Sequence, residues 1–431
     1  MSRIDDLDLD EKRLARRQKR RKSQIQAFIV LGVCVLLIAG VIGTGIHFLK
    51  EFINDRAARK AEEQAASIQA SLEAQNTVIE TPEENEEVQE MSQTDLLDEI
   101  VSTCISEMPL EDKVAGLFII TPEQLTGVDT AVKAGSGTQS ALTTYAVGGI
   151  VYSGKNIKSE DQITDMLGTT ASMSKYPIFT VVSEDGSDRG AITSSIGLEG
   201  IGPMTDPDLA TSAAQAIGNT LFQYKFNFNI APLTDLSESS PFGTDPEAAR
   251  GTMASFVTGM EESGITTCMS MFPASLDTKA GMAVDDRSAE DLQAQCYGMF
   301  TDAIATGHLN AVMVSNGSFP SIASDNTPAS LSKEVIEGQL RGDLGFGGIV
   351  ITAPLNEGAI TEYYTSEQAV VEAIKAGADM LYLPEDFEAA YQGLLEAVQS
   401  GKISEERIDE SLARIYRVKY ADRVDQITEG N

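Results

Sequence analysis

Residues 148–183 read GGIVYSGKNIKSEDQITDMLGTTASMSKYPIFTVVS. An apolar run, Gly148–Ser153, is followed by an amphipathic segment, Glu160–Ser174, and then by a second apolar run, Pro177–Ser183. Short and nearly continuous apolar runs are typical of strands that are covered on both faces, and such strands are usually parallel. The stretch therefore predicts one strand–helix–strand unit of a parallel sheet.

The same alternation continues on both sides of this stretch, with further amphipathic segments at Asp208–Gln223 and Ser288–Thr306. The apolar runs are Ala115–Ile120, Gly148–Ser153, Pro177–Ser183, Phe226–Pro232, Ile265–Phe272, Asn310–Asn316, Gly347–Thr352 and Ala378–Pro384. Eight such units predict an α/β fold of the (β/α)₈, or TIM-barrel, type. A doubly wound open sheet is the alternative. Its dinucleotide-binding version is disfavoured because no GxGxxG follows the first run.

In a barrel of this type the functional side chains lie where the strands end. We therefore take polar residues that end or follow the apolar runs as candidates for the rim of a pocket. They are Asn156, Glu184, Asp185, Asp235, Asn316 and Glu357.

Several segments in a fixed order resemble the N-terminal barrel of glycoside hydrolase family 3, in particular its bacterial β-N-acetylhexosaminidase branch. They are LEDKVAGLF (110–118), GGIVYSGKNIKSEDQI (148–163), NIAPLTDL (229–236), FGTDPEAA (242–249) and PASLSKEVIEGQLRGDLGFGGIVIT (328–352). The resemblance covers about residues 95–420. It implies a retaining glycosidase, which needs a carboxylate nucleophile and a proton donor on opposite sides of the glycosidic bond.

The residues at the positions that the resemblance assigns to catalysis do not suit this chemistry. The position of the nucleophilic Asp is Ala353, and the Lys-His pair after the fifth strand is replaced by Ser270 and Met271. A sugar-holding Asp after the third strand is replaced by Ser183. The Asp-x-His acid/base dyad has no counterpart, because the chain is shorter than the family pattern between Pro273 and Asp286.

These losses together predict a catalytically inactive homologue, a pseudoenzyme that serves as an interaction or scaffold module at the cell envelope. One alternative is a β-N-acetylhexosaminidase-type hydrolase of cell-wall amino sugars with a relocated acid/base pair, for which Asp185 and Glu357 are the first candidates. Another is a glycan-binding receptor without turnover. The partner is accordingly an envelope protein or a cell-wall glycan.

The N-terminal residues predict a location at the membrane. Residues 11–22 hold eight Lys/Arg, and Ala27–Ile46 is a run of twenty residues without a charge. Twenty helical residues span about 30 Å, the thickness of the hydrocarbon core. We expect a cytoplasmic tail (1–26), one transmembrane helix (27–49), a helical and acidic stalk (50–92), an extracytoplasmic barrel (93–425) and a short tail (426–431). A cleaved signal peptide is the alternative, and weak self-association through the stalk helix is a further expectation.

Net charge and residue counts disfavour several classes of function. The 431 residues carry a formal net charge of −33, which disfavours binding to nucleic acid. The only histidines are His47 and His308, so neither a metal site nor a cofactor is expected. The four cysteines have no CxxC spacing. We expect Cys268 and Cys296 to be buried, and their pairing stays open.

Overall fold

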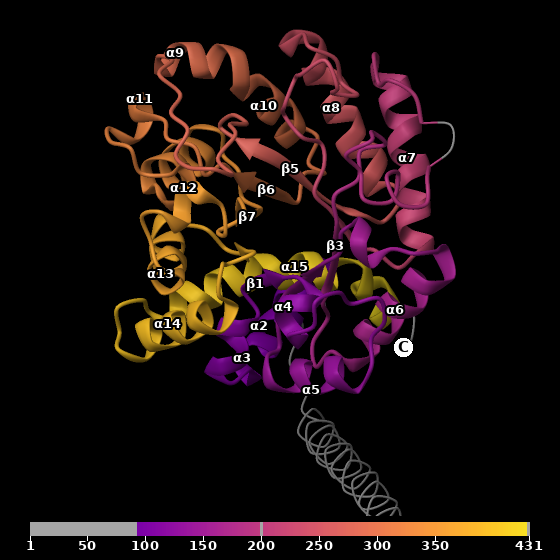
Figure 1. Cartoon of the computed structure of the whole chain (residues 1–431), viewed down its shortest axis with the longest axis vertical. Coiled ribbons are helices and arrows are strands. Elements are labelled where there is room, and N and C mark those ends of the chain that lie inside the picture. Colours follow the sequence, from indigo (N-terminus) through magenta and orange to yellow (C-terminus); the bar gives the residue numbers. More distant parts are fainter. Residues whose placement is uncertain (1–92, 199–200, 429–431) are drawn as a thin grey trace, which may run out of the picture. The chain divides into compact units, whose positions relative to one another are not determined.

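In a computed structural model of the chain, eight short parallel strands form the centre of the described part of the chain (Figure 1). The structure describes residues 93–198 and 201–428. The strands are β1 (Phe118–Ile120), β2 (Gly149–Val151), β3 (Phe179–Val182), β4 (Phe228–Asn229), β5 (Thr266–Phe272), β6 (Ala311–Val314), β7 (Ile349–Thr352) and β8 (Leu381–Tyr382). Each lies inside one of the eight predicted runs and is shorter than the run. The eight predicted strands and the parallel sheet are therefore confirmed.

The sheet follows the order β7-β6-β5-β4-β3-β2-β1-β8 and closes between its two end strands. Ile351 pairs in parallel with Met380, and the N–H groups of Asp379 and Met380 donate to the Val350 carbonyl at 2.7 and 3.0 Å. Closure thus uses Asp379 and Met380, which lie within the predicted run Ala378–Pro384 and directly precede β8. The result is a barrel of the TIM type.

Helices surround the strands (Figure 1). The larger ones are α2 (Gln93–Glu107), α3 (Leu110–Ala115), α5 (Ser136–Thr144), α6 (Glu160–Met173), α7 (Pro207–Gln223), α8 (Pro246–Glu261), α10 (Gly298–Ala305), α13 (Ser366–Ala376), α14 (Phe387–Gln399) and α15 (Glu405–Thr428). The shorter ones are α4 (Pro122–Thr126), α9 (Ala289–Leu292), α11 (Pro320–Ala323) and α12 (Gly358–Thr361), with π-helical turns at η2 (Gln293–Tyr297) and η4 (Glu334–Asp343). The single helix expected over Ser288–Thr306 is therefore α9, η2 and α10 in succession.

Burial explains why the apolar runs form these strands. Every residue of β1, β2, β3, β6 and β7 is buried. The helices bury apolar faces against them, as in α13, where Val370, Ala373 and Ile374 are buried and the capping box at Thr365 and Gln368 defines the first turn.

The predicted membrane span (residues 27–49) and stalk (50–92) lie outside the described residues. Among the helices within 93–198 and 201–428, none combines the length and the apolar character needed to cross a membrane.

Candidate functional site

The carboxyl ends of β5 and β7 form the part of the rim that holds Ser270, Met271 and Ala353. Ala353 directly follows β7 and is 1% exposed, and its N–H donates to the Val314 carbonyl at 2.8 Å. Ser270 is also buried. The Met271 N–H donates to Thr234 Oγ1 at 3.0 Å, so this segment is bonded to the loop after β4. None of the three side chains is a titratable group.

Glu184, after β3, is fully buried and holds its own loop together. Its carboxylate accepts hydrogen bonds from the N–H groups of Gly186, Ile192 and Thr193 at 2.7–2.9 Å and from Thr193 Oγ1 at 2.8 Å. Burial nevertheless raises the pKa of Glu184. A carboxylate with 0% exposure and four internal donors has a structural role in this conformation, because it cannot reach a ligand at the rim.

Asp185 and Asp235 also form hydrogen bonds or ion pairs with other residues of the rim loops. Asp185 Oδ1 accepts from the Ser187 N–H at 3.0 Å and from the Ser187 hydroxyl at 2.5 Å, which closes a turn. Asp235 forms an ion pair with Arg189 at 2.9 Å and accepts from Ser237 Oγ at 3.2 Å. The Asp235–Arg189 pair ties the loop after β3 to the loop after β4.

Asn156 is buried and caps the loop after β2. Its amide donates to Glu123 Oε1 at 2.7 Å and to the Ala131 carbonyl at 2.9 Å, and its Oδ1 accepts from the Ser153 N–H at 2.9 Å. Burial opposes ionisation of Glu123, but hydrogen bonds from the Ala131 N–H and from Asn156 hold the pKa of Glu123 below its ordinary value. Glu123 lies 33 positions from Asn156, and no local motif indicates this pairing.

Asn316 and Glu357 meet at the ends of β6 and β7. The Asn316 amide donates to Glu357 Oε2 at 3.1 Å, and the Thr278 hydroxyl donates to the same oxygen at 2.5 Å. The Gly358 N–H donates to the Lys279 carbonyl at 3.0 Å, and the Ala359 N–H donates to the Thr278 carbonyl at 3.1 Å. The loop after β5 is therefore bonded to the segment that follows β7.

The same loop is bonded to the loop after β6. Val284 pairs in parallel with Ser318, which in turn pairs with Pro328. Further along the loop, Asp285 is buried and accepts hydrogen bonds from Arg287 Nε at 2.9 Å and from Arg287 Nη2 at 2.6 Å. These guanidinium hydrogen bonds hold the pKa of Asp285 below its ordinary value of 3.8.

We predict that Asp285→Asn lowers the free energy of unfolding by about 1–2 kcal/mol at neutral pH, since charge-assisted hydrogen bonds of this kind are lost. Because the folded-state pKa is depressed, the contribution of Asp285 is present above about pH 4 and disappears as the pH falls through the folded-state pKa. Urea denaturation of both proteins between neutral pH and pH 3 checks this. Asp286→Asn, a change at the exposed neighbouring residue, is the matched control. A constant difference across this pH range would contradict the prediction.

The described cysteines, Cys104, Cys268 and Cys296, are free, and Cys268 and Cys296 are buried as expected. Burial raises the pKa of both Cys268 and Cys296, so neither is activated as a nucleophile. Within the described part of the chain, no group of three or more His, Cys, Asp or Glu side chains could hold a metal ion.

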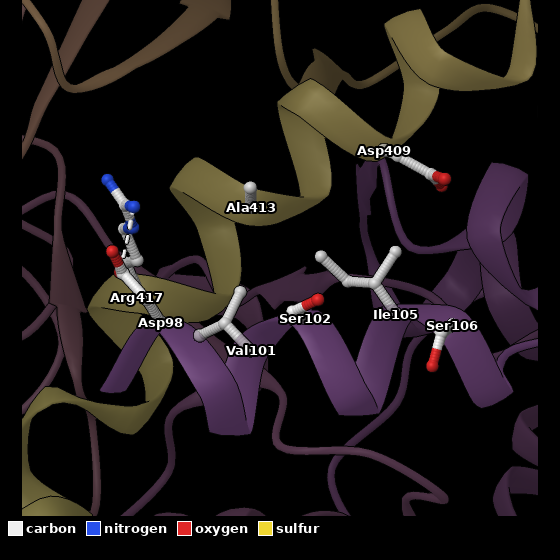
Figure 2. Close-up of a pocket in the computed structure, with 8 residues that line it drawn as sticks. All are labelled: Asp98, Val101, Ser102, Ile105, Ser106, Asp409, Ala413 and Arg417. Atoms are coloured by element: carbon white, nitrogen blue, oxygen red, sulfur yellow. Dashed lines mark ion pairs between the residues drawn. The ribbon is translucent and has the colours of Figure 1, made fainter. Parts of the chain in front are cut away.

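A groove of about 410 Å³ lies away from the rim, between α2 and α15 (Figure 2). Val101 and Ile105 of α2 face Ala413 of α15, and Asp98 and Arg417 form an ion pair of 2.7 Å across it. Because it is built by two outer helices, this groove contains no residue from a strand end.

Comparison with known proteins identifies the family. Residues 110–418 match the glycosyl hydrolase family 3 N terminal domain. The chain belongs to glycoside hydrolase family 3. The resemblance in the motifs is therefore confirmed for the fold and the family.

Relatives within glycoside hydrolase family 3 are distant in sequence. Beta-hexosaminidase A of Pseudoalteromonas piscicida is 24% identical over 323 residues, which cover 64% of this chain and 54% of that protein. The beta-hexosaminidase of Tolumonas auensis is 27% identical over 254 residues, 54% of this chain and 75% of that protein. The match thus spans about half the length of the Pseudoalteromonas protein.

Solved structures agree on the fold. A glycoside hydrolase family 3 beta-N-acetylglucosaminidase from Paenibacillus sp. superposes with a TM-score of 0.65 at 28% identity, covering 74% of this chain and 63% of that one. M tuberculosis LpqI superposes with a TM-score of 0.64 at 20% identity, covering 74% and 96%. The second likeness concerns the fold alone.

Proposed function

We propose that this member of glycoside hydrolase family 3 is not a hydrolase but a pseudoenzyme that serves as an interaction module at the cell envelope. The observation that carries the proposal is Ala353, which lies directly after β7, where the resemblance to the family places the nucleophile. A methyl group cannot attack an anomeric carbon. Loss of a nucleophile lowers the rate of such reactions by several powers of ten.

The surroundings of Ala353 support the proposal. A retaining mechanism needs two carboxyl groups about 5–5.5 Å apart on either side of the bond that is cleaved. The candidate carboxylates are already hydrogen-bonded within the protein: Glu184 to its loop, Asp185 to Ser187, and Glu357 to Thr278 and Asn316. Asp185 and Glu357 have no partner in common among these contacts.

A second candidate function is hydrolysis of β-linked amino sugars. The names of the relatives, beta-hexosaminidase and beta-N-acetylglucosaminidase, favour it. In this chain it requires a relocated acid/base pair, and Asp185 and Glu357 remain the first residues to consider. Both would have to exchange their present hydrogen bonds for contacts with a substrate.

The proposed location follows from the sequence. We propose that residues 27–49 anchor the chain in a membrane and that the barrel faces away from the cytoplasm, because the basic cluster at 11–22 favours the cytoplasmic side. The barrel would then meet envelope proteins or cell-wall glycans.

One experiment tests both parts of the proposal. We expect the full-length chain to remain with membranes after an alkaline wash. After solubilisation in detergent, it should release no chromophore from a β-N-acetylglucosaminide and cleave no peptidoglycan fragment above a heat-inactivated control.

Two variants distinguish the proposal from hydrolysis by a relocated acid/base pair. Turnover that is abolished by Asp185→Asn or by Glu357→Gln would overturn the proposal in favour of the relocated pair. Turnover that survives both changes would also overturn it and would point to other residues. Release of the chain by the alkaline wash would contradict the anchor alone.

A further inference from the structure

A pocket at the carboxyl-end rim lies beside the site discussed above and shares none of its candidate residues. Its volume is about 340 Å³, and Met282, Asp325, Asn326, Pro328, Tyr363 and Tyr364 contribute to its lining. It therefore gathers side chains from the loop after β5, the loop after β6 and the segment after α12. Ligand pockets typically measure about 300–1,000 Å³, so this one suits a single side chain or another small group.

The walls of the pocket are fixed by backbone contacts. The Asp285 N–H donates to the Ser318 carbonyl at 2.9 Å, and the Ser318 N–H donates to the Ala283 carbonyl at 2.8 Å. Val284 pairs with Ser318, which joins the loop after β5 to the loop after β6, and Ser318 also pairs with Pro328 within the loop after β6. The N–H groups of Tyr363 and Tyr364 donate to the Ile360 carbonyl at 3.0 and 2.9 Å. The pocket is thus preorganised for a ligand.

The pocket is lined by two aromatic side chains and by one negatively charged carboxylate. Tyr363 is 60% exposed, which is unusual for so large a side chain, and Val284 on the adjoining loop is 44% exposed. Asp325 Oδ1 accepts from the Thr327 N–H at 2.8 Å, and Oδ2 has no partner among the described residues. No Lys, Arg or His lines the pocket. Burial and the nearby charges of Asp325 and Glu372 raise the pKa of Tyr364, as a negative potential would.

We propose that this pocket binds a lysine or arginine side chain of a partner protein. A cation over a tyrosine face is attracted by the ring, and the Asp325 carboxylate supplies an ionic hydrogen bond. The alkyl stem of such a side chain would pack on Met282 and Pro328. The proposal rests on the role of the domain as an interaction module and names the chemistry that its partner presents.

Charge complementarity decides between the possible occupants. An anionic ligand would meet Asp325 without any balancing cation, in a protein of net charge −33. A neutral sugar could stack on Tyr363 but would make no use of the charge at Asp325. A long side chain with an apolar stem and a cationic end uses both features of the lining.

The probe is the peptide acetyl-Gly-Lys-Gly-amide, and its uncharged match carries norleucine in place of lysine. We expect the full-length chain in detergent to bind the lysine peptide about tenfold more tightly, as measured by saturation-transfer NMR titration in about 0.15 M salt. Asp325→Asn and Tyr363→Ala should each weaken binding by about fivefold or more, whereas Tyr363→Phe keeps the ring and should retain binding.

A control variant separates the pocket from the general negative charge of the protein. Asp161 on α6 is an exposed acid outside the pocket, and Asp161→Asn should leave binding unchanged. Equal binding by all variants, or preference for diacetylchitobiose over the lysine peptide, would overturn the inference. Neither outcome bears on the hydrolysis assay, so failure here is distinguishable from failure of the proposed function.

Discussion

Replacement of Asp379 by alanine is expected to lower the free energy of unfolding by about 3–5 kcal/mol, because it leaves three partly buried arginines without their counter-ion and a buried backbone N–H without its acceptor. Asp379 is fully buried. Its carboxylate pairs with Arg341 at 2.7 Å, with Arg414 at 3.0 Å and with Arg407 at 3.8 Å. It also accepts hydrogen bonds from the Val350 N–H at 2.9 Å and from Ser411 Oγ at 2.8 Å.

The position of Asp379 explains the size of the expected effect. The residue lies just before β8, where its own N–H donates to Val350 and helps to close the barrel. Its carboxylate also binds η4 through Arg341 and α15 through Arg407 and Arg414. One side chain therefore connects the barrel seam to two helices.

The measurement is the midpoint of urea denaturation, followed by circular dichroism of the full-length chain. Asp379→Asn separates the loss of charge from the loss of hydrogen bonds. Glu372→Gln is the matched control, because Glu372 forms an exposed pair with Lys375 at 2.9 Å, and such pairs contribute about 0–1 kcal/mol. A shift for Asp379→Ala no larger than that for Glu372→Gln would refute the prediction.

Gly148→Ala is expected to lower the free energy of unfolding by about 3 kcal/mol or more. A Cβ atom at this position would lie 2.0 Å from the carbonyl oxygen of Gly116 and 2.8 Å from Met380 Cε. The nearest atom belongs to the backbone, so no change of rotamer relieves the clash. The Gly148 carbonyl accepts from the Phe179 N–H at 3.0 Å and from Lys419 Nζ at 2.8 Å, so a shift of this backbone would also disturb β2 and α15.

The chain supplies a matched control for this substitution. The sequence Gly-Gly-Ile-Val occurs at 148–151 and again at 347–350. A Cβ atom at Gly347 would meet no atom within 4 Å, so Gly347→Ala should be neutral or slightly stabilising. Both variants are compared by thermal and urea denaturation. Equal stability of the two would show that the region around Gly116 adapts, contrary to the prediction.

The sequence could predict the strands because each apolar run is a local signal. All eight strands lie within the predicted runs, although each strand is shorter than its run. The order of the motifs also predicted the family. No structure was needed to identify the residues at these strand ends, because the residue types are read directly from the sequence. They are Ala353, Ser270 and Met271.

The state of the candidate residues depended on distant parts of the chain. Glu357 receives a hydrogen bond from Thr278, 79 positions earlier, and Asp235 is paired with Arg189, 46 positions earlier. Asn156 is bonded to Glu123 across 33 positions. No local pattern contains such pairings. The sequence could therefore predict these residues as rim candidates, but it could not predict that each is already hydrogen-bonded or ion-paired within the protein.

The sequence by itself determined the barrel, the family and the absence of a carboxylate at position 353, since periodicity, motif order and residue identity are local properties. Only the tertiary structure decided which polar groups are hydrogen-bonded and which pocket remains open beside Tyr363. It also decided that the first glycine of the segment 148–151 has no room for a side chain, whereas the first glycine of the identical segment 347–350 has room. The physical reason is that hydrogen bonds and steric contacts form between segments that folding brings together. The partner of a residue can therefore lie far from it in the sequence.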